Sequence, residues 1–151
     1  MSNWVRVKGI VKKGYGVASG CTRDPRFPQG TIEMQKPFFR ERGLDLEGYF
    51  PGTINLSIAP HQYRVRQAKY TFKNIKWSID APAEDFSFFD CRIIPISGEA
   101  IVGSIYYPHP ETKPEHFQSP DILELLAPYI SDLTYGNELT IEVDQRQIEI
   151  T

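Results

Sequence analysis

Alternating apolar residues constrain the fold of this chain more than any other feature of its sequence. In "WVRVKGIVK", residues 4–12, Val5, Val7 and Val11 share one parity, with charged residues among the intervening positions. Successive side chains of a β-strand point to opposite faces, so this pattern is typical of a half-buried strand. The same period recurs in "TINLSI" at 53–58, where the apolar side chains occupy the even positions. The alternation predicts a mainly β domain.

More strands are expected towards the C-terminus. Segment 62–79 has the composition of one long bent strand or of two short ones. Segments 86–96 and 99–107 flank Ser97-Gly98, which suits a tight hairpin. "ELTIEV" and a short "QIEI" close the chain as terminal strands.

One segment, "SPDILELLAP" at 119–128, predicts a helix. Ser119 can cap its start, Pro120 fits the first helical position, and Pro128 should end it. Its buried face would consist of Ile122, Leu125 and Leu126.

The composition is that of one globular domain spanning residues 1–151. Apolar residues make up 40% and charged residues 24%, and no apolar run is long enough to span a membrane. With a formal net charge of -2, the chain lacks the clustered positive field that nucleic-acid phosphates require, so neither nucleic acid nor a membrane is an expected partner.

The N-terminal "MSNWVRVKGIVKK" mixes charge into every few residues, unlike a secretory signal, so cytoplasmic localisation is the default expectation. The oligomeric state stays open.

Two connections, 13–52 and 108–118, are too long to be ordinary turns, and such loops in compact domains are usually functional. The first begins with "GYGVASG", in which Gly14, Gly16 and Gly20 allow backbone N–H groups to turn towards an anion. This segment lacks the ending of a Walker P-loop and does not open a helix in a βαβ unit. Without further information, the glycines are simply turn residues.

Thr53 and Asn55 occupy alternate positions at the start of an expected strand, so their side chains point to the same face, roughly 6 to 7 Å apart. A hydroxyl and an amide oxygen are ligands that suit Mg²⁺, which takes its remaining ligands from water and substrate phosphates. The alternative is that both are polar strand residues beside a glycine turn.

Four stretches carry a resemblance to a known family: "GIVKKGYGVASG", "GYFPGTINLSI", "IYYPHPETKPEHFQSPDILELLAP" and "YGNELTIEV". They occur in the order and approximate spacing of the CTP-dependent, archaeal-type riboflavin kinases, and the chain resembles a divergent relative of that family. The resemblance implies a small closed β-barrel of the cradle-loop type, with one short helix and long loops that hold the ligands between them.

The same resemblance implies roles for individual residues. Thr53 and Asn55 would be the Mg²⁺ ligands, and Thr112 and Glu124 would hold the flavin. The nucleotide would lie against Gly14, Tyr15, Gly16, Val17, Ala18 and Ser19.

The implied activity is transfer of the γ-phosphoryl group of CTP, or of another nucleoside triphosphate, to riboflavin, which gives FMN. No general base is evident, so no catalytic residue is assigned. The chain has Ser131 and Asp132 where the resemblance leads us to expect a cation; Lys36, Arg40 and Arg42 could replace it or could be surface charges. A non-catalytic protein that binds a flavin or a nucleotide, and a kinase of another small alcohol, remain alternatives.

Overall fold

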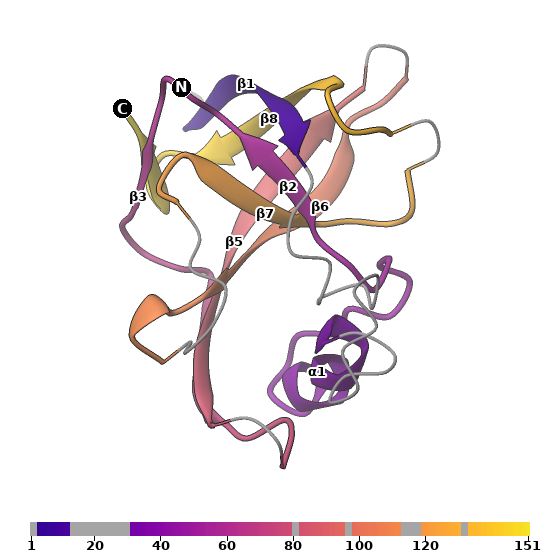
Figure 1. The fold of residues 1–151 in the computed structure, drawn as a ribbon, viewed down its shortest axis with the longest axis vertical. Helices are drawn as coiled ribbons and strands as arrows, with labels where there is room; N and C mark the ends of the chain where they lie inside the picture. Colours follow the sequence, from indigo (N-terminus) through magenta and orange to yellow (C-terminus); the bar gives the residue numbers. More distant parts are fainter. Residues whose placement is uncertain (1–2, 13–30, 80–81, 96–97, 113–118, 131–132) are drawn as a thin grey trace.

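The structure, a computed structural model, describes residues 3–12, 31–79, 82–95, 98–112, 119–130 and 133–151. Its elements are, in chain order, β1 (Trp4–Lys12), α1 (Thr31–Arg40), β2 (Ile54–Ser57), β3 (Tyr63–Val65), β4 (Tyr70–Ile75), β5 (Glu84–Ile94), β6 (Ile101–Pro108), the 3-10 helix η1 (Pro110–Thr112), β7 (Ile122–Leu126), β8 (Glu138–Asp144) and β9 (Ile148–Ile150). This mainly β architecture confirms the expected fold class (Figure 1).

Six antiparallel strands close into a small barrel. Their order is β5-β6-β7-β2-β1-β8, and β8 pairs back with β5. Closure gives every strand of the barrel two neighbours, which removes the unpaired edges that an open sheet exposes. The expected closed barrel is therefore confirmed, and β1, β2, β5, β6 and β8 coincide with strands that the alternation predicts. In Figure 1 the barrel forms the upper part of the molecule, and β5 runs down from it.

Strand β5 has 11 residues because it takes part in two arrangements at once. One edge pairs with β6 from Phe86 to Ile93. The other edge pairs with β4 through Phe86 and Phe88, and then with β8 from Cys91 to Ile94. The partner on this edge therefore changes between Phe88 and Cys91.

The same point on β5 separates two hydrophobic cores. Phe89, Cys91 and Ile93 belong to the core inside the barrel, whereas Phe86 and Phe88 belong to a second core on the other face of the wall. Neighbouring strand residues point to opposite faces, so Phe88 and Phe89 fill different cores. A strand that is buried on both faces loses its polar alternation, which explains the nearly continuous run "FSFF".

Helix α1 covers the outer surface of the barrel wall. Ile32, Gln35 and Phe39 follow the three- and four-residue spacing of one helix face, and all three are buried. The Phe39 ring centroid lies 5.1 Å from that of Phe86 and 5.0 Å from that of Phe88, in edge-to-face contacts.

In the described part of the chain, no helix is long and apolar enough to cross a membrane.

The expected helix at 119–128 is wrong, because this segment forms strand β7 between β2 and β6. Leu123 and Leu125 point into the barrel core, and Leu126 points outward into the second core. Burial on both faces gives an apolar run that resembles the buried side of a short helix. The helix that does form, α1, lies in segment 13–52, for which the sequence predicts a loop because it is rich in Gly, Pro and charged residues. Pro37 stands within this helix.

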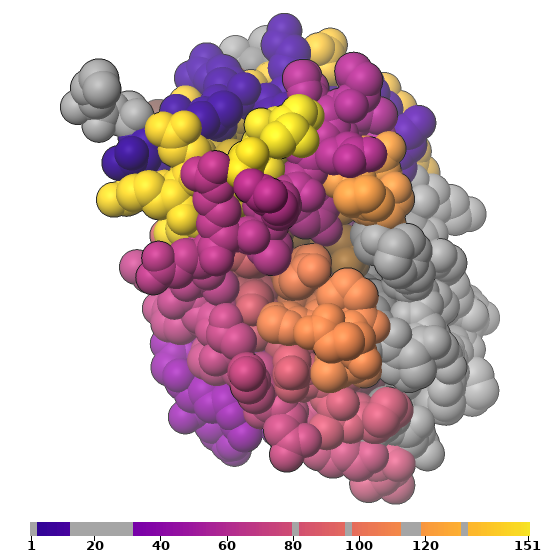
Figure 2. All heavy atoms as spheres, turned by 90° about the vertical axis from the view of Figure 1, so that its left-hand side faces the viewer, coloured from indigo at the N-terminus to yellow at the C-terminus, as the bar shows by residue number. Residues whose placement is uncertain are grey.

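Segment 62–79 forms two short strands, one of the two alternatives that its composition left open. β4 extends the sheet beside the lower half of β5, and β3 pairs with β9 in a separate two-stranded sheet, from Tyr63↔Ile150 to Val65↔Ile148. Figure 2 shows the C-terminal strand in yellow against the magenta segment that contains β3. This pairing fixes the end of the chain to the side of the barrel.

Two glycines allow barrel strands to approach one another closely. A Cβ atom on Gly9 in β1 would lie 2.5 Å from the carbonyl oxygen of Ser57 in β2. A Cβ atom on Gly103 in β6 would lie 2.8 Å from the carbonyl oxygen of Leu126 in β7. Both distances are too short for any side chain, so glycine is required at both positions. The two close approaches flank the β2–β7 pair on either side.

A glutamine side chain fills the gap where β5 changes partner. Gln147, in the turn between β8 and β9, accepts a hydrogen bond from the Asp90 N–H and donates one to the Asp90 carboxylate, both at 2.8 Å. Its own carbonyl accepts hydrogen bonds from the N–H groups of Arg66 and Gln67, at 2.8 and 3.0 Å. Partly buried backbone N–H groups need such partners, so Gln147 continues the strand ladder by side-chain contacts.

Replacing the Gln147 side chain tests whether its hydrogen bonds to Asp90 stabilise the fold. We expect Gln147→Ala to lower the free energy of unfolding by about 1–3 kcal/mol, because the Asp90 N–H loses its partner in a partly buried setting. Urea denaturation measures the change. The matched control is Gln145→Ala, two positions earlier, where the side chain is exposed and the backbone makes the contacts. Equal unfolding midpoints for the two variants would contradict a stabilising role of the Gln147 side chain.

Candidate functional site

Three oxygen-bearing side chains meet on neighbouring strands of the barrel wall. Asn55 in β2 is the register partner of Glu124 in β7. The hydroxyl of Thr53, directly before β2, donates to Oε1 of Glu124, with 3.4 Å between the two oxygens. All three residues are partly exposed, so a ligand can reach them. We name Thr53, Asn55 and Glu124 the oxygen cluster.

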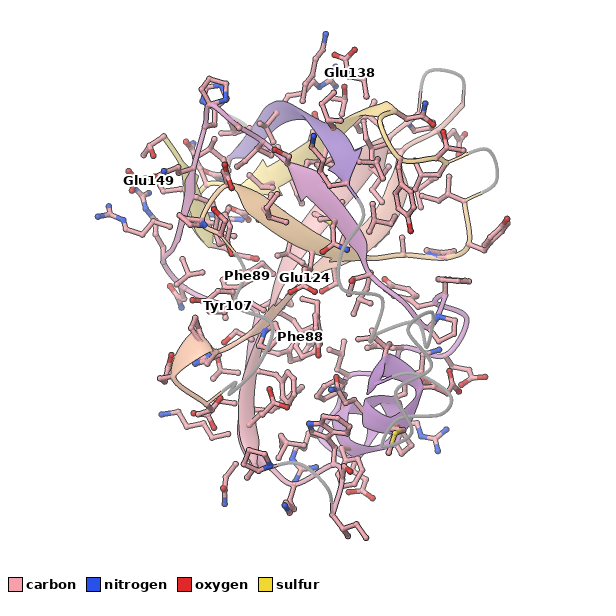
Figure 3. All side chains as sticks on the ribbon, viewed as in Figure 1. Phe88, Phe89, Tyr107, Glu124, Glu138 and Glu149 are labelled. Atoms are coloured by element: carbon pink, nitrogen blue, oxygen red, sulfur yellow. The ribbon has the colours of Figure 1, made fainter. Side chains whose placement is uncertain are left out.

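The oxygen cluster lies on the outside of the barrel. Leu56 in β2 and Leu123 and Leu125 in β7 belong to the barrel core, so the residues that alternate with them point outward. Figure 3 shows Glu124 beneath β7 at the centre of the view, between the barrel and the part that holds α1, whereas Glu138 and Glu149 lie at the periphery. Local spacing in the sequence groups Thr53 with Asn55 but places Glu124 on an expected helix, so it gives no sign that Glu124 faces the same side as they do.

A tyrosine connects the oxygen cluster to α1. The β6–β7 register pairs Ser104 with Leu126 and Ile105 with Leu125, and its continuation brings Tyr106 opposite Glu124 on the outer face. The buried Tyr106 hydroxyl donates to Oε1 of Gln35 in α1, at 2.7 Å. The helix and the cluster are therefore positioned against the same side chain.

The phenols near Glu124 stay neutral. Burial raises the pKa of Tyr106 well above its ordinary value, and the Glu124 carboxylate raises it further. Burial likewise raises the pKa of Tyr63, with smaller contributions from Tyr107 and Glu124. A phenol with a raised pKa keeps its proton at physiological pH, so Tyr106 remains a hydrogen-bond donor to Gln35.

The second residue expected to hold a flavin, Thr112, has structural hydrogen bonds. Its hydroxyl donates to the His109 carbonyl at 3.1 Å and accepts a hydrogen bond from the Asp85 N–H at 2.9 Å. These contacts tie η1 to the start of β5. A hydroxyl has one donor and two acceptor positions, so Thr112 can still accept one hydrogen bond but has no donor left. Its role in binding a flavin stays a prediction.

The expected nucleotide segment 14–19 lies outside the described residues, as do Ser131 and Asp132. Lys36 and Arg42, two of the cations that could replace the one missing at Ser131 and Asp132, form hydrogen bonds to nearby backbone carbonyls. The Lys36 ammonium donates to the Tyr49 carbonyl, and the Arg42 guanidinium donates to the Phe38 carbonyl, both at 2.8 Å. They support α1 and the loop that follows it.

The residues of the oxygen cluster fit a hard cation. A carboxylate, an amide oxygen and a hydroxyl are all oxygen ligands of the kind that Mg²⁺ takes. Among the described residues, no three His, Cys, Asp or Glu side chains are grouped so that they could hold a metal ion. With a single carboxylate, the cluster would bind Mg²⁺ weakly by itself and would need the oxygens of a bound phosphate to complete the coordination.

An exposed aromatic pair lies at the same end of the β2–β7 pair as Thr53. Phe50 and Tyr129 have ring centroids 5.7 Å apart and remain 44% and 73% exposed. The Phe50 N–H donates to the Ala127 carbonyl at 2.9 Å, which fixes one ring beside the end of β7. Large exposed aromatic rings offer a surface on which a planar ligand can stack. Alternation of apolar residues gave no sign of Tyr129, because it lies beyond the strand.

No protein-family model, curated protein or solved structure matches this chain. The chemistry of the site therefore rests on its own residues.

Manganese provides a direct test of the oxygen cluster, because Mn²⁺ takes the same oxygen ligands as Mg²⁺ and broadens nearby NMR signals. We expect sub-stoichiometric Mn²⁺ to broaden the amide signals of residues 53–56 and 123–125 first, and Asn55→Ala to abolish this selectivity. Glu149→Gln serves as the control, since it removes a carboxylate from a distant surface. Broadening centred elsewhere, and unchanged in Asn55→Ala, would contradict a cation site at the cluster.

Proposed function

We propose that this protein is a Mg²⁺-dependent kinase that transfers the γ-phosphoryl group of a nucleoside triphosphate, CTP or another, to the primary hydroxyl of riboflavin and so produces FMN. The observation that carries the proposal is the convergence of Thr53, Asn55 and Glu124 on one exposed face. The resemblance of the sequence to CTP-dependent riboflavin kinases named the same three residues for Mg²⁺ and flavin.

The chemistry suits a small site of this kind. Phosphoryl transfer requires alignment of the two reactants and neutralisation of charge more than covalent help from the protein. Bound Mg²⁺ would supply charge neutralisation at the transferred phosphate. Thr53 and Asn55 offer it neutral oxygens, and the Glu124 carboxylate can accept a hydrogen bond from a hydroxyl or ring N–H of the flavin, which would hold the acceptor beside the nucleotide. No general base is assigned.

The exposed pair Phe50 and Tyr129 supports a planar ligand near the oxygen cluster. Both a nucleotide base and the flavin ring system are flat and aromatic, and stacking on an aromatic side chain stabilises such rings. The pair thus favours ligands of these two classes over small aliphatic alcohols.

The kinase reaction is tested by following FMN formation from riboflavin with CTP or ATP, with and without Mg²⁺. We expect Mg²⁺-dependent turnover, and we expect Asn55→Ala and Glu124→Gln to lower kcat/KM by about 100-fold, as for removal of one electrostatic contact to a transition state. Ser57→Ala is the matched control, because Ser57 lies on the same strand and the same outer face, one alternate position further along. We expect it to leave kcat/KM nearly unchanged.

Calorimetric titration with CTP, ATP and riboflavin separates the alternatives. Mg²⁺-dependent nucleotide binding that is lost in Asn55→Ala supports the kinase. Binding of flavin or nucleotide without turnover would instead indicate a non-catalytic binding protein. Nucleotide turnover with another small alcohol, but not with riboflavin, would retain the reaction class and replace the acceptor. Absence of nucleotide binding under every condition would overturn the proposal.

A further inference from the structure

A lysine extends the row of polar side chains that contains the oxygen cluster. Lys12, the last residue of β1, is the register partner of Asn55, which in turn is the partner of Glu124. The preceding residue, Val11, is 4% exposed and belongs to the barrel core. Neighbouring strand residues point to opposite faces, so Lys12 projects outward on the same face as Asn55.

The spacing of these strands brings the Lys12 ammonium within reach of the oxygen cluster. Adjacent strands lie about 5 Å apart, so the backbone of Lys12 is about 5 Å from that of Asn55 and about 10 Å from that of Glu124. The four-carbon side chain of a lysine spans such a distance and carries its ammonium beyond the strand. The ammonium can therefore lie over the oxygen cluster and contact a group that is bound there.

Two other lysines of the described residues, Lys8 and Lys36, have partners. Lys8, on the same strand and face, lies 3.9 Å from the Glu138 carboxylate, and the Lys36 ammonium donates to the Tyr49 carbonyl. Lys12 is exposed, and no hydrogen bond or ion pair to its ammonium occurs in the described part of the chain. An unpaired ammonium that can reach past Asn55 is suited to contact an anion bound at the oxygen cluster.

We propose that Lys12 is the phosphate-binding cation of this site and that it makes the site selective for a polyphosphate. The inference rests on the proposed function, and it adds to that function the residue that contacts the phosphates. A triphosphate carries several negative charges, and one Mg²⁺ beside the Glu124 carboxylate compensates only part of them. An ammonium on the neighbouring strand supplies a further positive charge at hydrogen-bonding range.

Calorimetric titration with Mg²⁺-tripolyphosphate isolates this contact, because tripolyphosphate has neither a base nor an acceptor. We expect Lys12→Met to weaken its binding by about tenfold or more, the usual cost of losing a charge-assisted hydrogen bond. Lys12→Arg, which keeps the charge, should recover most of the affinity. Lys8→Met is the matched control, since it removes one positive charge from the same face of β1 and should change binding less than about twofold, because its interaction with the cluster is screened by salt.

The outcomes separate this inference from the kinase proposal. Equal affinities for Lys12→Met and Lys8→Met, with loss of binding only in Asn55→Ala, would overturn the role of Lys12 and leave the kinase proposal standing. Selective loss in Lys12→Met without turnover of any acceptor would support the phosphate site and remove the kinase. A wild-type protein that binds neither tripolyphosphate nor CTP would overturn both. Riboflavin binding is expected to be unchanged in Lys12→Met.

Discussion

The arrangement of this protein depends on one strand that serves two structures. β5 keeps β6 as its partner along one edge, while its other edge passes from β4 to β8 between Phe88 and Cys91. The barrel is closed only because β8 reaches β5 there, and the outer core beneath α1 exists only because β5 continues beyond the barrel. The Gln147 side chain, which pairs with Asp90 in the gap, allows the change of partner without an unsatisfied backbone group.

The oxygen cluster lies on the outer wall of the barrel, so the residues that form it are different from those that stabilise the barrel core. The side chains that fill the barrel alternate along β2 and β7 with those of the oxygen cluster, so the interior remains apolar while the exterior carries hydroxyl, amide and carboxylate groups. The wall is rigid because each strand has neighbours on both sides. Rigid strands hold ligand-binding oxygens more accurately than loops do, which lowers the entropic cost of binding.

The sequence was sufficient for the fold class and for part of the candidate site. Alternation identified strands with one face in water, such as β1 and β2, because their polar and apolar residues separate by parity. It failed at β7, where Leu123 and Leu126 are buried in different cores and Glu124 is the one polar residue of the strand. Thr53 and Asn55 could be paired from local spacing alone. Glu124 and Lys12 join them only through the register of strands that are distant in sequence, and that register follows from barrel closure rather than from any local pattern.

The division of β5 between two faces makes the molecule unequally tolerant of changes in chain length. Phe86 and Phe88 face the outer core and Phe89, Cys91 and Ile93 face the barrel core, so one unbroken alternation along β5 serves both cores. Loss or gain of a single residue at this point would reverse the alternation for everything on one side of it, for example turning Phe89, Cys91 and Ile93 outward and Asp90 inward. Single-residue insertions and deletions are therefore expected to be tolerated better in the connections of the chain than within β5.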